Sequence, residues 1–141
     1  MSESKQTLIV DCDGVIADKK YGGQYAKAGP LQFGIDQVNK LYDMGFTITL
    51  YTARYGDRCS GNIHKQYEIG YKEWTDWLEK YGVKYHHAFM GKPAGAIYID
   101  DKAARVEDDS KEGWGQVWKE VYSLEGKDKY GNPPGFVDGS S

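Results

Sequence analysis

The sequence predicts an α/β fold: a Rossmann-like, doubly wound, mainly parallel sheet with helices on both faces. Short runs of β-branched and aliphatic residues alternate along the chain with longer segments whose apolar residues recur every three or four positions. Glycines follow the two longest helical segments, where a helix would end. Alternating strands and helices favour right-handed crossovers, and these make neighbouring strands parallel.

The first predicted strand covers residues 8–10 and stops at Asp11-Cys12-Asp13-Gly14. Its period of two puts Asp11 and Asp13 on the same side of the strand. Two adjacent carboxylates either keep a proton on one of them or recruit a cation, so they suit acid/base chemistry or Mg²⁺ binding. Gly14 permits a sharp turn. The alternative is a solvated acidic turn, because Asp and Gly are common in turns.

A polar, glycine-rich loop is expected over 18–30, either as a lid beside the acids or as an ordinary surface loop. A helix over 33–44 then ends at Gly45, and a strand over 46–51 leads to Thr52-Ala53-Arg54. A right-handed crossover between the two strands would place the acids and Thr52 at the same edge of the sheet.

The second half of the chain predicts a helix over 64–81, a short third strand over 83–89, a fourth strand over 96–99 and a weaker helix over 115–124. The fourth strand would stop at Asp100-Asp101. From Gly126 onward no apolar period is present. We therefore expect one domain over 1–125 and a flexible tail over 126–141.

Polar residues thus end or follow each predicted strand: Asp11 and Asp13, Thr52 and Arg54, Lys92, and Asp100 and Asp101. In an open parallel sheet the ligand site lies outside the carboxyl ends of the strands. Each cluster alone has an ordinary explanation as a turn former, a helix cap or a solvated side chain. Their order along the chain points to a single site.

These residues resemble the four short motifs of the haloacid dehalogenase superfamily of phosphotransferases. The sequence Asp11-Cys12-Asp13-Gly14-Val15 is similar to the first motif, Thr52 to the second, Lys92-Pro93 to the third and Asp100-Asp101 to the fourth. The resemblance covers residues 8–101. Its finer details are similar to those of small capsule-biosynthesis or sugar phosphatases, and to the phosphatase domain of bacteriophage polynucleotide kinases.

The resemblance implies that Asp11 attacks phosphorus and that Asp13 serves first as general acid and then as base. It also implies that Thr52 and Lys92 hold the phosphoryl oxygens. Mg²⁺ would be bound by Asp11, the Asp13 main-chain carbonyl and Asp100/Asp101. These roles agree with the chemistry, since a carboxylate that attacks a phosphate dianion needs nearby positive charge.

Substrate binding is expected from Thr52, Ala53, Arg54 and Lys92, with Arg54 as a forked donor to the phosphate or an adjacent polar group. The alternative is a surface Arg54 paired with a nearby acid. Members of the superfamily insert cap domains between the motifs, but here the intervals 14–51 and 53–91 are each taken up by a helix and its strand. The chain therefore resembles capless members, whose site is open unless a loop or a second subunit covers it.

Composition limits the partners. The formal net charge of -3 gives no broad basic surface for nucleic acid, and the polar start of the chain predicts neither a signal peptide nor a membrane span. Two cysteines without metal-site spacing predict free thiols in a cytoplasmic protein. We expect a small phosphate ester as substrate, no membrane partner, and a homo-oligomer as an open alternative.

The leading interpretation is a Mg²⁺-dependent phosphomonoesterase that acts through a phosphoaspartate, with a sugar phosphate as the expected substrate. A nucleotide or nucleic-acid-end phosphatase is the alternative, with Arg54, Arg58, His64 and Lys65 as a local clamp. Two non-catalytic alternatives are a metal-binding relative and a receiver-like switch. A receiver would place a lone Asp after its third strand, and none follows residues 83–89.

Overall fold

The computed structural model of the protein describes residues 5–137. It divides into two compact units, Met1–Ile99 and Asp100–Ser141, and each is described by itself. The expected single domain over 1–125 and the flexibility of 126–141 stay predictions, and residues 138–141 lie outside the described part.

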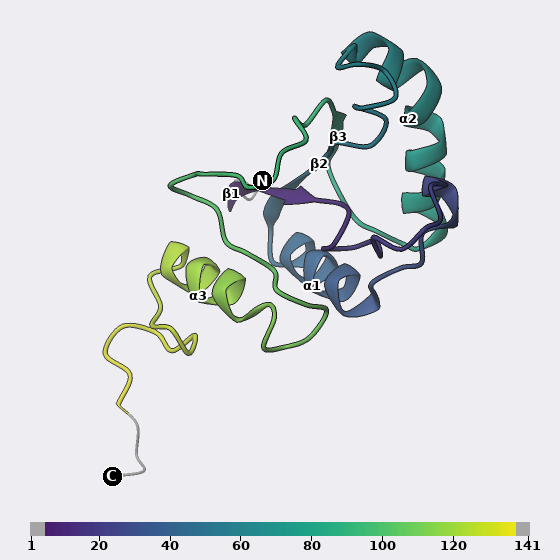
Figure 1. The fold of residues 1–141 in the computed structure, drawn as a ribbon. Coiled ribbons are helices and arrows are strands. Elements are labelled where there is room, and N and C mark those ends of the chain that lie inside the picture. The colour runs from purple at the N-terminus through teal and green to yellow at the C-terminus, as the bar shows by residue number, and fades with distance from the viewer. Residues whose placement is uncertain (1–4, 138–141) are drawn as a thin grey trace. The chain divides into compact units, whose positions relative to one another are not determined.

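The first unit is built on a parallel sheet of three strands in the order β1-β2-β3: β1 (Lys5–Asp11), β2 (Phe46–Thr52) and β3 (His87–Met90) (Figure 1). β1 and β2 pair in parallel with Leu8 opposite Ile48, and β2 and β3 pair in parallel with Leu50 opposite Ala88. The predicted α/β class and its parallel sheet are confirmed.

The alternation of β2 decides which of its residues enter the core. Phe46, Ile48 and Leu50 are buried, whereas the threonines between them are only half-buried. Burial of each such side chain stabilises the fold by roughly 1.5–3 kcal/mol. The face that carries Ile9 is different, since Ile9 is 70% exposed. Coverage of that face by a helix stays a prediction.

Two helices connect the strands of this unit: α1 (Gln32–Asp43) and α2 (Ile63–Lys80) (Figure 1). α1 contacts β2, and α2 contacts β3. α2 begins after Asn62, whose side-chain oxygen accepts a hydrogen bond from the Lys65 N–H at 3.1 Å. Gly45 follows α1 with a φ of +102°, the left-handed conformation that commonly ends a helix.

The predicted third strand is confirmed only for its second part, because residues 83–86 form no strand. The predicted fourth strand over 96–99 is wrong. Ile97 and Ile99 are 76% and 94% exposed, and no strand of the described chain pairs with this segment. Between them the Tyr98 hydroxyl donates to the Pro93 carbonyl at 2.6 Å, which holds the segment as a loop. High β-propensity forms a strand only where a partner completes the hydrogen bonds.

The second unit contains α3 (Gly115–Leu124), as the apolar spacing predicts. Within this unit the ring of Trp118 lies 5.7 Å from that of Tyr122. After the helix, the Asp128 carboxylate accepts the N–H groups of Tyr130 and Asn132, both at 2.9 Å. The start of the predicted tail is thus a hydrogen-bonded turn.

Cys12 and Cys59 are both free and buried, so the prediction of free thiols is confirmed. The Trp74 indole N–H donates to the Cys12 sulfur at 3.4 Å. Burial raises the pKa of the Cys12 thiol to about 12, which keeps it protonated and unreactive at neutral pH. Within residues 5–137, no helix is both long enough and apolar enough to cross a membrane.

Candidate active site

The turn after β1 forms the centre of the candidate site. Asp11 ends the strand, and the Cys12 carbonyl then accepts the N–H groups of Ile16 and Ala17 at 2.9 and 3.1 Å. Gly14 has a φ of +86°, a conformation that side chains with a Cβ rarely adopt. These bonds fix the backbone around both acids.

Asp11 and Lys92 are brought together as the strand order predicts. The Lys92 ammonium lies 3.0 Å from one Asp11 carboxylate oxygen, and the other oxygen accepts the Cys12 N–H at 2.7 Å. The Asp11 side chain is 37% exposed, so one side of it remains open to solvent. The Lys92 main chain is anchored because its N–H donates to the Thr52 carbonyl at 3.1 Å.

Asp13 is held by Arg54. The guanidinium Nη2 lies 2.8 Å from Asp13 Oδ1, and Nε lies 3.2 Å from each carboxylate oxygen. Arg54 is 2% exposed. It is thus paired with an acid, as the alternative interpretation has it, but in the interior rather than on the surface. Contact between Arg54 and a substrate stays a prediction.

Thr52 is fully buried at the end of β2, and its hydroxyl oxygen accepts the Arg54 main-chain N–H at 3.2 Å. Ala53, the next residue, accepts the Gly56 N–H on its carbonyl at 3.0 Å. Parallel pairing of β1 with β2 places Asp11 opposite Tyr51. Thr52 therefore lies one residue beyond the register position of Asp11, close to where the sequence predicts it.

Two aromatic rings enclose the Arg54 guanidinium. Its Cζ lies 5.1 Å from the Tyr25 ring centroid and 5.6 Å from that of Trp77. Burial alone would lower the pKa of Arg54, but the hydrogen bond and charge of Asp13 raise it above its usual value. Nη1 is buried without a hydrogen-bond partner in the described chain, and the two cation–π contacts offset part of that cost.

The two ends of the loop 18–30 are bonded to each other, and its C-terminal end is bonded to α2. The Asp18 N–H donates to the Gly29 carbonyl at 2.9 Å, and the Trp77 indole donates to the Ala28 carbonyl at 2.8 Å. Near its middle, a short 3₁₀ helix, η1 (Tyr25–Lys27), carries the ring that covers Arg54. The loop therefore supports the Arg54–Asp13 pair, and its role as a lid stays a prediction.

Asp100 and Asp101 begin the second unit, and both are exposed. The Asp100 carboxylate accepts the Lys102 N–H at 2.8 Å. Within residues 5–137 no three His, Cys, Asp or Glu side chains are grouped as a metal site would require. Asp11 and the Asp13 backbone still fit Mg²⁺, because this ion commonly binds to one or two carboxylates and keeps several waters.

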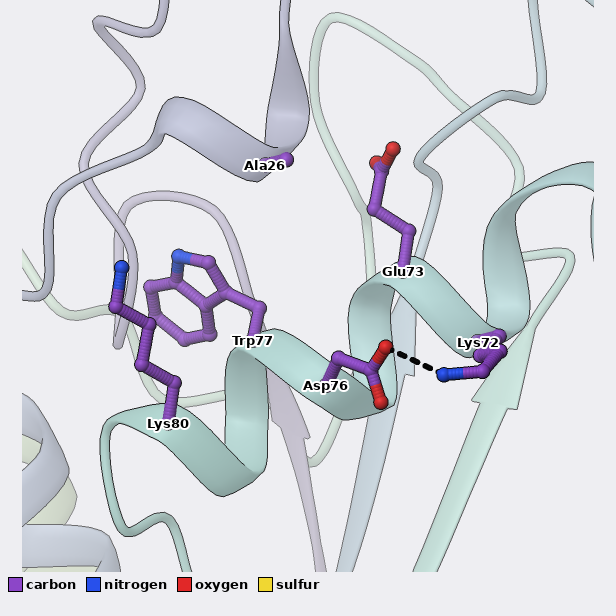
Figure 2. A pocket seen from close by; sticks show the side chains of 6 residues that line it. All are labelled: Ala26, Lys72, Glu73, Asp76, Trp77 and Lys80. Carbon is purple, nitrogen blue, oxygen red and sulfur yellow. Dashed lines mark hydrogen bonds and ion pairs between the residues drawn. The ribbon is translucent and has the colours of Figure 1, made fainter.

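Two surface hollows lie in the first unit. The larger, of about 470 Å³, is lined by five residues of α2 and by Ala26 of η1, and none of them is a predicted site residue (Figure 2). Figure 2 shows Lys72 and Asp76 paired along its edge. The smaller, of about 320 Å³, includes Lys92 in its lining. The smaller hollow therefore shares Lys92 with the Asp11–Lys92 pair.

No pattern in the sequence identifies the residues that support Arg54. Tyr25 lies in a loop without periodicity, and the spacing of Trp77 within α2 predicts only a core residue. Gln66 is likewise buried, and its amide donates to the Arg54 carbonyl at 3.1 Å. A polar residue on the apolar face of a helix was the one available signal.

No protein-family model matches the chain, and no curated protein is significantly similar to it. Among solved structures, the crystal structure of a structural-genomics target from Vibrio cholerae matches with a TM-score of 0.71 and 31% sequence identity. The match covers 84% of this chain and 95% of the Vibrio chain. The similarity extends over nearly the whole of both proteins. The chain therefore belongs to the same protein family as this Vibrio cholerae protein.

Proposed function

We propose that the protein is a Mg²⁺-dependent phosphomonoesterase that acts through a phosphoaspartate on Asp11, with a small phosphorylated metabolite such as a sugar phosphate as its substrate. The observation that carries the proposal is the Asp11–Lys92 contact of 3.0 Å at the carboxyl end of the sheet. It combines a partly exposed carboxylate with a fixed cation, which is what nucleophilic attack on a phosphate dianion needs.

In the first half-reaction, Asp11 Oδ attacks phosphorus, the phosphorus–oxygen bond to the leaving group breaks, and that oxygen takes a proton. Lys92 neutralises charge on the transferring group. Thr52, one register position beyond Asp11 at the end of β2, is the proposed hydrogen-bond donor to a phosphoryl oxygen. In the second half-reaction, water attacks the phosphoaspartate and restores the Asp11 carboxylate.

Asp13 is the proposed proton carrier for both halves. The Arg54 guanidinium fixes the position of its carboxylate, which would take a proton from the attacking water in the second half-reaction. The Asp13 side chain is 25% exposed, so water can reach it. It then returns to the protonated form in which it can serve the next leaving group.

In the first unit, the residues that would hold Mg²⁺ are Asp11 and the Asp13 main-chain carbonyl, while a contribution from Asp100 or Asp101 stays a prediction from the sequence. When bound, the ion supplies positive charge that lowers the repulsion between nucleophile and phosphate. The Lys92 ammonium shares that task and, through its contact with Asp11, keeps the carboxylate oriented.

The test is hydrolysis of a panel of phosphate esters with Mg²⁺ by the wild type and by Asp11→Asn. The panel contains sugar phosphates, mononucleotides and an oligonucleotide with a 3′-phosphate. We expect wild-type turnover and near-complete loss in Asp11→Asn, with unchanged circular dichroism. Asp36→Asn, at an exposed acid of α1, is the matched control. Comparable activity in folded Asp11→Asn would exclude the covalent mechanism, and an inactive wild type would favour the non-catalytic alternatives.

A nucleic-acid-end phosphatase is the second candidate, and one observation favours it. Arg58 is exposed near the site, and its Cζ lies 5.0 and 5.1 Å from the ring centroids of Tyr25 and Tyr55. An exposed cation stacked on aromatic rings can bind a phosphate backbone. Preference for the oligonucleotide in the same panel would support this candidate.

A further inference from the structure

The smaller hollow, of about 320 Å³, lies between the loops that follow two neighbouring strands. One wall comes from the segment between β2 and the first turns of α2, and the other comes from the loop after β3. Its lining consists of Gly56, Asp57, Gly61, Ile63, Gln66, Gly91, Lys92, Pro93 and Ala94. Ligands of open parallel sheets bind beyond the carboxyl ends of the strands, which is where this hollow lies.

Both walls are fixed by hydrogen bonds before any ligand binds. The Tyr51 hydroxyl donates to the Gly91 carbonyl at 3.4 Å, and Gly61 N–H donates to the Gly56 carbonyl at 3.0 Å. Gln66, which is 2% exposed, is anchored through its amide to the Arg54 carbonyl. The hollow is therefore preformed, which reduces the entropy lost on binding.

Lys92 connects the hollow to the nucleophile. It belongs to the lining, and its ammonium lies 3.0 Å from the Asp11 carboxylate. A phosphate held between Asp11 and Lys92 would therefore have the hollow beside it. The group that leaves with the bridging oxygen then needs a space, and this hollow offers one.

The lining is suited to an uncharged, hydroxyl-rich group. Ile63, Pro93 and Ala94 offer an apolar wall for the C–H face of a sugar ring. Asp57 is exposed, and no hydrogen bond or ion pair within residues 5–137 engages its carboxylate. A free carboxylate accepts hydrogen bonds from hydroxyls and repels further anionic groups. The volume lies at the lower end of ligand pockets, roughly 300–1,000 Å³, and so suits one small ring.

We propose that this hollow is the leaving-group subsite of the enzyme, that it selects a neutral polyol such as a single sugar ring, and that Asp57 is its specificity-determining residue. This proposal rests on the proposed phosphomonoesterase function. It predicts that a leaving group with additional phosphates, such as a nucleic acid strand, is disfavoured by the Asp57 charge.

The experiment compares kcat/KM for a hexose phosphate, an aryl phosphate and a 3′-phosphorylated oligonucleotide in the wild type, Asp57→Ala, Asp57→Asn and the control Asp36→Asn. We expect Asp57→Ala to lower kcat/KM for the hexose phosphate at least about tenfold, since hydrogen bonds to a charged acceptor are among the strongest. The aryl phosphate, which has no hydroxyls, should change less than about twofold. Asp57→Asn should reduce discrimination against the oligonucleotide.

The outcomes separate the subsite from the reaction. If Asp57→Ala hydrolyses all three substrates and the ratios of their kcat/KM values match those of the wild type, the subsite is overturned and the proposed function stands. A wild type inactive on all three would overturn the proposed function and the subsite with it. An equal fall in kcat/KM for the hexose phosphate and the aryl phosphate in Asp57→Ala would also overturn the subsite. It would show that Asp57 acts on the phosphate group that both substrates share.

A second variant tests the space itself. Ala94→Trp should fill the hollow, raise KM for the hexose phosphate at least about fivefold, and leave inhibition by inorganic phosphate unchanged, because free phosphate carries no leaving group. Unchanged KM in Ala94→Trp would contradict the proposal. So would a matching rise in the inhibition constant of phosphate, which would indicate a displaced Lys92 rather than a filled subsite.

Discussion

Arg54, two residues beyond β2, forms a forked ion pair with Asp13, two residues beyond β1, with Nη2 to Oδ1 at 2.8 Å. The Arg54 side chain is 1% exposed and that of Asp13 is 25% exposed. The pair joins the ends of two neighbouring strands in a largely buried place. If one charge of such a buried pair is removed, the remaining charge stays buried without an opposite charge to stabilise it.

Arg54→Ala should therefore destabilise the protein, by about 3 kcal/mol, near the lower end of the range for broken buried pairs because Asp13 keeps some solvent contact. Urea unfolding measures the change. Lys84→Ala is the control, because Lys84 pairs with Asp43 at 2.9 Å on the surface and should cost less than about 1 kcal/mol. Similar losses in both variants would contradict the structural role of Arg54.

Asp13→Asn should lower kcat by roughly 10²–10⁴, the usual contribution of a general acid or base. The main-chain carbonyl is retained, so the affinity for Mg²⁺ should change less than turnover. Steady-state kinetics and calorimetric titration with Mg²⁺ measure the two effects. A large loss of Mg²⁺ affinity with nearly normal kcat would reverse the roles assigned to this residue.

Gly70→Ala should destabilise the protein by about 1 kcal/mol or more, although alanine favours helices. An added Cβ would lie 2.4 Å from Tyr55 Cδ2 and 3.1 Å from Met90 Cε, and overpacking of this kind costs about 1–3 kcal/mol. Gly115→Ala, where an added Cβ meets nothing within 4 Å, is the matched control. In a Tyr55→Ala background the penalty should largely disappear, and persistence there would refute the steric explanation.

Because of Tyr55, the free energy of unfolding should fall as the pH rises above about 10. Burial and the hydrogen bond to Glu73 raise the pKa of Tyr55 to about 12, above the value of about 10 for an unfolded tyrosine. Between these values the folded protein keeps a proton that the unfolded chain has lost, so rising pH favours unfolding. Urea unfolding from pH 9 to 11 should show a smaller decline for Tyr55→Phe than for the wild type. Tyr130→Phe, at a residue 73% exposed, should leave the slope unchanged.

Much of the first unit could be predicted from the sequence because its signals are local. Alternation in β2 and the apolar spacing in α2 are properties of consecutive residues, and a parallel sheet follows from their order. The same reasoning brings Asp11, Thr52 and Lys92 to one edge, since each follows or ends a strand of that sheet. Backbone topology alone is enough to place them there.

The tertiary structure decided which side chains pair, because side-chain direction depends on neighbours distant in sequence. Arg54 turns to Asp13 where Tyr25 and Trp77 enclose it, and no local pattern connects these four residues. The segment 96–99 has the composition of a strand but pairs with no strand within residues 5–137, and its Tyr98 bonds to Pro93 instead. A strand needs a neighbouring strand to complete its hydrogen bonds, and a buried ion pair needs side chains that enclose it; only the folded chain supplies either.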